Sequence, residues 1–158
     1  MEREIRFRAK PDKFLFSEFD NVPTEDGFVF GTPDTRMLNV PGAEKWRKEH
    51  EMVDQPSIVA MTRDGWPYSV AVQEETIGEF TGLRDKSGRD IYEGDIVRWD
   101  KDGRIYVVEF RSGMFYANIE PCNSHISGGF PLWCLCEEEQ HCAIVGNRYE
   151  NPEMLKKE

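Results

Sequence analysis

Glycine-containing turns dominate the stretch from residue 79 to residue 116 and restrict the chain to a β architecture. Asp85–Gly88, Asp100–Gly103 and Arg111–Gly113 each separate two short apolar runs. Asp and Gly favour tight turns because Asp bonds the nearby backbone and Gly tolerates a positive φ. The stretch therefore predicts short antiparallel strands joined by tight turns, with Gly88 at a positive φ.

These strands are predicted to bend strongly. Arg104–Phe110 is apolar on nearly both faces, which predicts a central strand covered on both sides. Gly94 interrupts the strand predicted over Ile91–Trp99, and glycine inside a strand often marks a bulge or a barrel corner. Together these features predict a small, strongly bent SH3-like barrel over residues 76–150.

Residues 1–75 are predicted to form a β meander with one short helix. Glu4–Ala9 alternates apolar and polar side chains, as a half-buried strand does. Ser57–Thr62 and Tyr68–Val72 flank a polar turn and predict a hairpin. The helix is expected near residues 43–53, where a thin apolar stripe recurs at helical spacing.

The end of the chain predicts two more short strands and a tail. Leu132–Cys136 and Cys142–Gly146 are apolar runs separated by a polar turn, and both are interpreted as strands. Residues 151–158 are expected to form a short C-terminal tail.

The charge and hydropathy of the chain make some classes of binding partner unfavourable. A formal net charge of -10 and a pI of about 4.9 disfavour phosphate backbones and anionic membrane surfaces. No apolar run is long enough to span a bilayer, and Met1–Arg8 lacks the apolar core of a signal peptide. We therefore expect a cytoplasmic protein that contacts no membrane and keeps its cysteines reduced.

Cysteine and histidine residues cluster toward the C-terminus and are candidate ligands of a zinc site. The members of this cluster are Cys134, Cys136, His141 and Cys142, with Cys122 and His125 upstream. Zinc needs four convergent donors, but Cys-x-Cys is an unusual spacing and adjacent strand residues point to opposite faces. Buried thiols acting as small apolar side chains are the favoured interpretation, so no metal or cofactor is expected, and a zinc site is the alternative.

A group of four acidic residues is the basis of an alternative prediction, that the protein is a metal-dependent hydrolase. The members of this acidic set are Asp85, Asp90, Glu93 and Asp95. Clustered carboxylates can hold a divalent cation or run acid–base hydrolysis, but a turn explains Asp85 and the glycine kink explains Asp95. The chain has no phosphate-binding loop, no Gly-x-Ser-x-Gly elbow and no His-Glu-x-x-His pair. We therefore predict a protein without enzymatic activity and assign no catalytic residue.

Two features are candidate binding surfaces. Arg6 and Arg8 lie on the predicted polar face of the first strand and can meet phosphates or, as favoured here, acidic groups of the protein or of a second subunit. Trp66, Tyr68 and Trp99 can act as stacking platforms, although tryptophan more often fills a core or an interface.

Three blocks of the sequence resemble a known family. Their residues are Glu4–Ala9, Thr76–Val97 and Ile144–Leu155, and in this order they are similar to the YopX-like proteins of phages and prophages. Within the middle block the matching residues are Thr81, Gly82, Leu83, Asp85, Gly88, Ile91, Tyr92, Gly94 and Asp95. The resemblance implies a mainly β fold and a bacterial or prophage origin, and it supplies no activity and no functional residue.

The sequence therefore predicts a prophage-encoded accessory protein, an interaction or assembly module that forms a homo-oligomer. Unpaired strand edges favour this interpretation, because they are templates for another chain. A host or phage protein is a further possible partner. The alternatives are nucleic-acid binding, a DNA mimic that occupies a host factor, and a metal-dependent hydrolase built on the acidic set.

Overall fold

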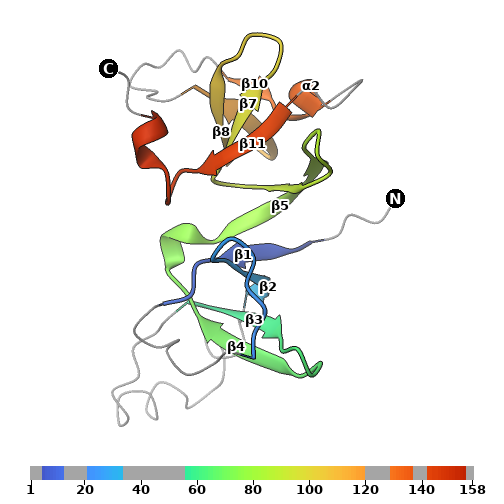
Figure 1. Ribbon diagram of the computed structural model, residues 1–158, viewed down its shortest axis with the longest axis vertical. Helices are drawn as coiled ribbons and strands as arrows, with labels where there is room; N and C mark the ends of the chain where they lie inside the picture. Colours follow the sequence, from blue (N-terminus) through green and yellow to red (C-terminus); the bar gives the residue numbers. More distant parts are fainter. Residues whose placement is uncertain (1–4, 13–20, 34–55, 120–128, 137–141, 156–158) are drawn as a thin grey trace. The chain divides into compact units, whose positions relative to one another are not determined.

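The chain folds into two compact units, each built from short antiparallel strands (Figure 1). They are the N-terminal unit, Ile5–Ile77, and the C-terminal unit, Gly78–Glu158. The computed structural model describes residues 5–12, 21–33, 56–119, 129–136 and 142–155. The predicted mainly β fold is confirmed, and the helix predicted near residues 43–53 lies outside the described residues.

Four strands and one 3-10 turn make up the described part of the N-terminal unit. They are β1 (Phe7–Ala9), β2 (Val29–Pro33), β3 (Ser57–Met61), β4 (Pro67–Ala71) and η1 (Glu74–Thr76). The strands are hydrogen-bonded in the order β4-β3-β2-β1. Antiparallel pairing runs from Ser57 opposite Ala71 to Met61 opposite Pro67, so the predicted hairpin is confirmed.

Small aliphatic side chains form the core of this unit, and its sheet curls without closing. Ile58, Val70 and Val72 are buried against Ala9 and Val29. An isolated bridge between Pro11 and Val72 joins the ends of the outermost strands. This bridge touches one corner only, so the described sheet stays open along the rest of its length.

The C-terminal unit contains a hairpin and a five-stranded sheet. Its elements are β5 (Gly78–Arg84), β6 (Asp90–Tyr92), β7 (Asp95–Trp99), β8 (Ile105–Arg111), β9 (Met114–Asn118), β10 (Phe130–Pro131), α2 (Trp133–Cys136), β11 (Cys142–Asn147) and η2 (Pro152–Leu155). The order β10-β9-β8-β7-β11 places β8 in the centre, as its two apolar faces predict. In the described residues this sheet is not closed, so the SH3-like barrel is not confirmed.

Two local predictions meet different outcomes. Gly94 lies in a tight turn that separates β6 from β7, so the predicted kink is a complete strand break. The strand predicted at Leu132–Cys136 is wrong, because the chain makes the helical turn α2 there. The N–H of Leu135 donates to the carbonyl of Leu132 at 3.0 Å, which turns both fully buried side chains toward one core. A strand would place residues three apart on opposite faces.

The core of the C-terminal unit lies under β7, β8 and β9. Tyr106, Val108, Val97, Leu132 and Leu135 are all fully buried in it. Each fully buried aliphatic side chain contributes about 1.5–3 kcal/mol relative to its exposed state. The polar side chains considered next lie at the ends of β5, β6 and β11, outside this core.

Candidate functional site

Asp85 accepts hydrogen bonds from the turn between β5 and β6 and from β11. Its carboxylate is fully buried. Oδ1 accepts the N–H groups of Ser87 at 2.8 Å and Arg89 at 3.0 Å. Oδ2 accepts two guanidinium N–H groups of Arg89, at 3.0 and 2.8 Å, and the N–H of Ile144 at 3.1 Å. With its acceptor positions filled by the protein, Asp85 stabilises the fold.

The environment keeps Asp85 ionised. Burial alone would raise the pKa of this carboxyl, but the backbone N–H groups of Arg89 and Ile144, the Arg89 side chain and the Ser87 N–H together lower it below the ordinary value of 3.8. Hydrogen bonds that the charged form accepts favour that form. Asp85 is therefore a permanent anion at neutral pH and not a general acid.

This lowered pKa predicts an acid-sensitive fold. A carboxyl with a lower pKa in the folded state stabilises the protein above its unfolded-state pKa and loses that contribution as pH falls through the folded-state value. The free energy of unfolding should therefore decline as pH drops below the ordinary pKa of 3.8, with a slope from this group of at most about 1.4 kcal/mol per pH unit. Carboxyl-carbon NMR titration measures the pKa directly. A value for Asp85 at or above the ordinary one would contradict the hydrogen-bond assignment.

A second buried carboxylate holds the turn that contains Gly94. Oδ2 of Asp95 accepts the N–H of Tyr92 at 2.9 Å, and Oδ1 accepts the side-chain amide of Asn147 at 3.5 Å. The carbonyl of Gly94 accepts the N–H of Arg148 at 2.9 Å. Asp95 therefore closes the tight turn between β6 and β7 and links it to the end of β11.

The C-terminal segment is held by a similar set of polar contacts. Arg148 pairs with Glu109 at 2.8 Å, and the amide of Asn118 donates to the other Glu109 oxygen at 2.6 Å. The N–H of Asn147 donates to the side chain of Asn151 at 3.1 Å. These contacts fasten the segment after β11 to strands β8 and β9.

Each member of the acidic set has a hydrogen-bond or ion-pair partner within the protein. Asp85 and Asp95 are used as described above, Asp90 pairs with Arg84 at 2.8 Å, and Glu93 accepts the N–H of Phe110 at 3.2 Å. Among the described residues, no group of three or more His, Cys, Asp or Glu side chains could hold a metal ion. This geometry offers the hydrolase alternative no support, and sequence reasoning had already assigned Asp85 and Asp95 to backbone capture.

The basic face predicted on the first strand differs from the observed one. Arg8 is only 9% exposed, and its guanidinium carbon lies 4.4 Å from the centroid of the Phe28 ring. Lys10 approaches the same ring at 5.6 Å. Arg6 is half-buried, whereas Ile5, expected on the inner face, is exposed. Cation–π contact and its long aliphatic stem let Arg8 occupy a buried position against Phe28.

The three aromatic candidates have different surroundings. Trp66 is 72% exposed, at the tip of the β3–β4 hairpin. Tyr68 is half-buried against the core of the N-terminal unit. Trp99 packs against the core of the C-terminal unit, with its ring 6.1 Å from that of Phe130. The structure therefore places Trp66 and Tyr68 on one hairpin and Trp99 in the other unit, and of the three only Trp66 presents most of its ring to solvent.

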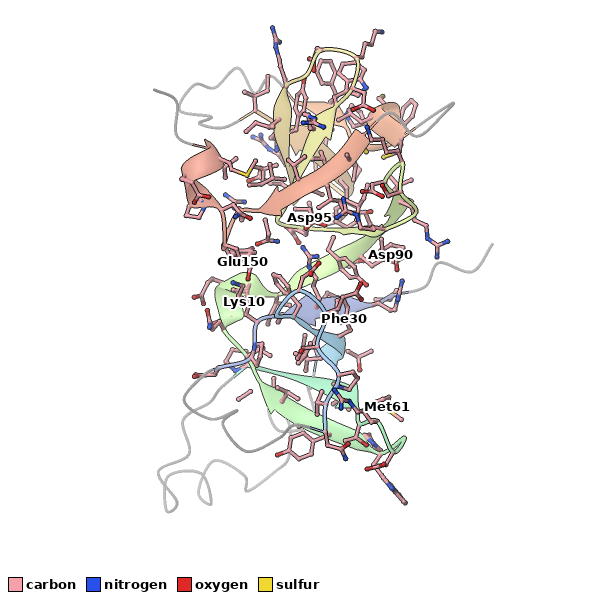
Figure 2. The ribbon with its side chains drawn as sticks, in the orientation of Figure 1. Lys10, Phe30, Met61, Asp90, Asp95 and Glu150 are labelled. Carbon is pink, nitrogen blue, oxygen red and sulfur yellow. The ribbon has the colours of Figure 1, made fainter. Side chains whose placement is uncertain are left out.

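Sequence reasoning missed a second exposed apolar residue at the end of this hairpin. Met61 ends β3, pairs with Pro67 across the hairpin and is 54% exposed; Figure 2 shows it at the end of the strand. The signal available in the sequence was the apolar residue on each side of a polar turn. We call Met61 and Trp66 the hairpin-tip pair, and this pair is the candidate interaction site.

The described residues form a mainly β protein in which buried carboxylates and amides brace tight turns. The family model described as YopX protein matches residues 30–156. The chain belongs to the YopX family, which confirms the resemblance drawn from the sequence blocks.

Other comparisons add little. No curated protein matches the chain. The chain is similar to protein EF1440 from Enterococcus faecalis, whose crystal structure shares 20% sequence identity with a TM-score of 0.45, and the match covers 98% of this chain and 100% of that one. A likeness at this level carries no inference about function. Within the described residues, no helix has the length and apolar character needed to cross a membrane.

Proposed function

We propose that the protein is a non-enzymatic accessory protein, encoded by a phage or prophage, that self-associates through its hairpin-tip pair. The observation that carries this proposal is the exposure of Trp66, at 72%, on a turn held by several hydrogen bonds. Tryptophan is among the residues most enriched at binding hot spots, because its large ring buries much apolar area with few rotatable bonds.

The turn holds Trp66 in a defined position. Its N–H donates to the Thr62 hydroxyl at 3.0 Å, and its carbonyl accepts the N–H of Thr62 at 2.8 Å. The turn is anchored at its side, where the N–H of Arg63 donates to the carbonyl of Asn21 at 2.9 Å and the Asn21 amide donates to Asp64 at 2.7 Å. A side chain that is already ordered loses less entropy on binding.

Contact through side chains fits this hairpin better than pairing of strand edges. β4 is the outermost strand of the order β4-β3-β2-β1, but it begins with Pro67, which has no N–H to donate. Proline on an edge strand opposes pairing with another chain. The apolar surface of Trp66 and Met61 is therefore the surface that we assign to the contact.

The charges around the hairpin tip are compatible with a second copy of the chain as the binding partner. Arg63 and Asp64 are both exposed beside Trp66, so the tip carries one positive and one negative side chain. A two-fold contact sets each patch against itself, and this arrangement can place Arg63 of each copy opposite Asp64 of the other. The net charge of -10 opposes association in general, and salt screens that repulsion.

Sedimentation velocity over a wide range of protein concentration tests the proposal. We expect the wild-type protein to shift toward a dimer as concentration rises. Trp66→Ala should weaken this association by about 30-fold, because truncating a hot-spot tryptophan costs about 2 kcal/mol or more. The substitution should leave the stability of the monomer within about 0.5 kcal/mol, since Trp66 is mostly exposed.

Trp133→Ala is the matched control. Trp133 is 48% exposed in the C-terminal unit, so its truncation should leave the dimerisation constant unchanged. A wild-type protein that is monomeric at every concentration would overturn self-association. Equal weakening by both substitutions would overturn the assignment to the hairpin tip.

A further inference from the structure

Two cysteine side chains meet where α2 ends and β11 begins. The Sγ atoms of Cys136 and Cys142 lie 3.6 Å apart and share a thiol hydrogen bond. Cys142 is fully buried and Cys136 is half-buried, and both are free thiols. A disulfide brings its sulfurs to about 2.05 Å, so a modest side-chain movement separates the present contact from a covalent bond.

The two sides of this contact differ in how firmly the backbone holds them. The carbonyl of Cys142 accepts the N–H of Lys86 at 2.9 Å, and the N–H of Ile144 donates to the buried Asp85 carboxylate. Cys142 is thus fixed in β11 by the same turn that Asp85 organises. Cys136 ends a helix of one turn, where its side chain is nearer to solvent.

The shared proton makes the two thiols unequal. The hydrogen bond from Cys136 lowers the pKa of the Cys142 thiol, against the effect of burial. The same hydrogen bond, followed by burial, raises the pKa of the Cys136 thiol. Cys142 is therefore the more acidic thiol of the pair.

We propose that Cys136 and Cys142 form a redox-active dithiol that small-molecule disulfides, such as oxidised glutathione, convert into an intramolecular disulfide. Cys136 loses its proton to water and attacks one sulfur of the small disulfide, which forms a mixed disulfide and releases one small thiolate. Cys142 then loses its proton to water, attacks the Cys136 sulfur, forms the Cys136–Cys142 bond and releases the second small thiolate, and the two released thiolates take up the two protons. The two protein sulfurs together lose two electrons, and the small disulfide gains them.

The two exchange steps should differ in rate, because the two thiols differ in pKa and in position. The first step needs the Cys136 thiolate, so its rate should rise with pH. The second step is intramolecular and starts from the Cys142 sulfur, which already lies at contact distance. The mixed disulfide should therefore not accumulate, and the intramolecular bond should be the first oxidation product detected.

Thiol counting and mass spectrometry test the proposal on the full-length protein. The reduced protein is equilibrated in a glutathione buffer with the reduced form in excess, quenched with acid and labelled with N-ethylmaleimide. A fully reduced chain takes up a label on each of its 4 cysteines, and the bridged chain should lose two of those labels. Cleavage after Glu137, Glu138 and Glu139 separates Cys136 from Cys142, so the bridge should appear as a linked peptide pair that dithiothreitol separates.

Serine variants assign the bridge to its two sulfurs. Cys134→Ser is the matched control, because Cys134 lies on the same helix and is exposed, and this variant should retain the linked pair. Cys136→Ser should abolish it, and circular dichroism checks that the variant is folded. Full labelling of the oxidised wild type would overturn the proposal, as would a linked pair that survives in Cys136→Ser.

Discussion

Replacement of Asp85 by alanine should lower the free energy of unfolding by about 3–4 kcal/mol. The substitution removes an acceptor that receives five hydrogen bonds. Three of the donors are backbone N–H groups, of Ser87, Arg89 and Ile144, and a buried donor without an acceptor costs about 1–3 kcal/mol. Urea unfolding followed by tryptophan fluorescence measures the loss.

Arg89→Ala measures the contribution of the ion pair to stability separately from that of the backbone hydrogen bonds. The Arg89 side chain is 51% exposed, so solvent screens its pairing with Asp85 and its removal should cost only about 1 kcal/mol. Asp85→Asn keeps one oxygen acceptor and should fall between the two alanine variants. If Arg89→Ala destabilised the protein as much as Asp85→Ala, the ion pair and not the backbone capture would be the main contribution.

Replacement of Gly94 by alanine should destabilise the protein by about 2–5 kcal/mol. Gly94 has a φ of 85°, a conformation that costs other residues about 1–2 kcal/mol. A Cβ at this position would lie 2.7 Å from Cε2 of Tyr149, so the ring or the turn must also move, at a further cost of about 1–3 kcal/mol. Thermal and urea unfolding measure the total.

Gly82→Ala is the matched control for backbone strain. Gly82 has a φ of 82°, but a Cβ there would meet nothing within 4 Å. This variant should therefore lose only about 1–2 kcal/mol. Tyr149→Ala should cost less in the Gly94→Ala background than in the wild type, because it removes the ring that the new methyl meets. Equal losses for the two glycine variants, with additive effects of Tyr149→Ala, would contradict the steric part of the prediction.

The turns were predictable because their chemistry is local. Asp85 and Gly88 stand within one turn, and the structure places Gly88 at a φ of 80°, as predicted. At Gly94 the sequence predicted a kinked strand, and the structure shows a tight turn between two strands there. In each case the residues that decide the conformation are neighbours in sequence, so the pattern contains the needed information.

The helical turn α2 was not predictable in this way. A run of apolar residues such as Leu132–Cys136 suits a short buried strand and a buried helical turn equally well. The core decides between them, because Leu132 and Leu135 both reach it only when they share one side of the backbone. Likewise Arg8 has a charged side chain but is buried, because its guanidinium packs over the Phe28 ring.

By itself, the sequence determined the β class, the position of several tight turns and membership of the YopX family, because each depends on residues close together in the chain. Only the tertiary structure decided that Asp85 would bind the N–H of Ile144, 59 positions away in the chain. It also decided that Cys136 would meet Cys142 and that Trp66 would remain exposed. Burial and long-range contact depend on which elements meet, and a local pattern does not contain that information.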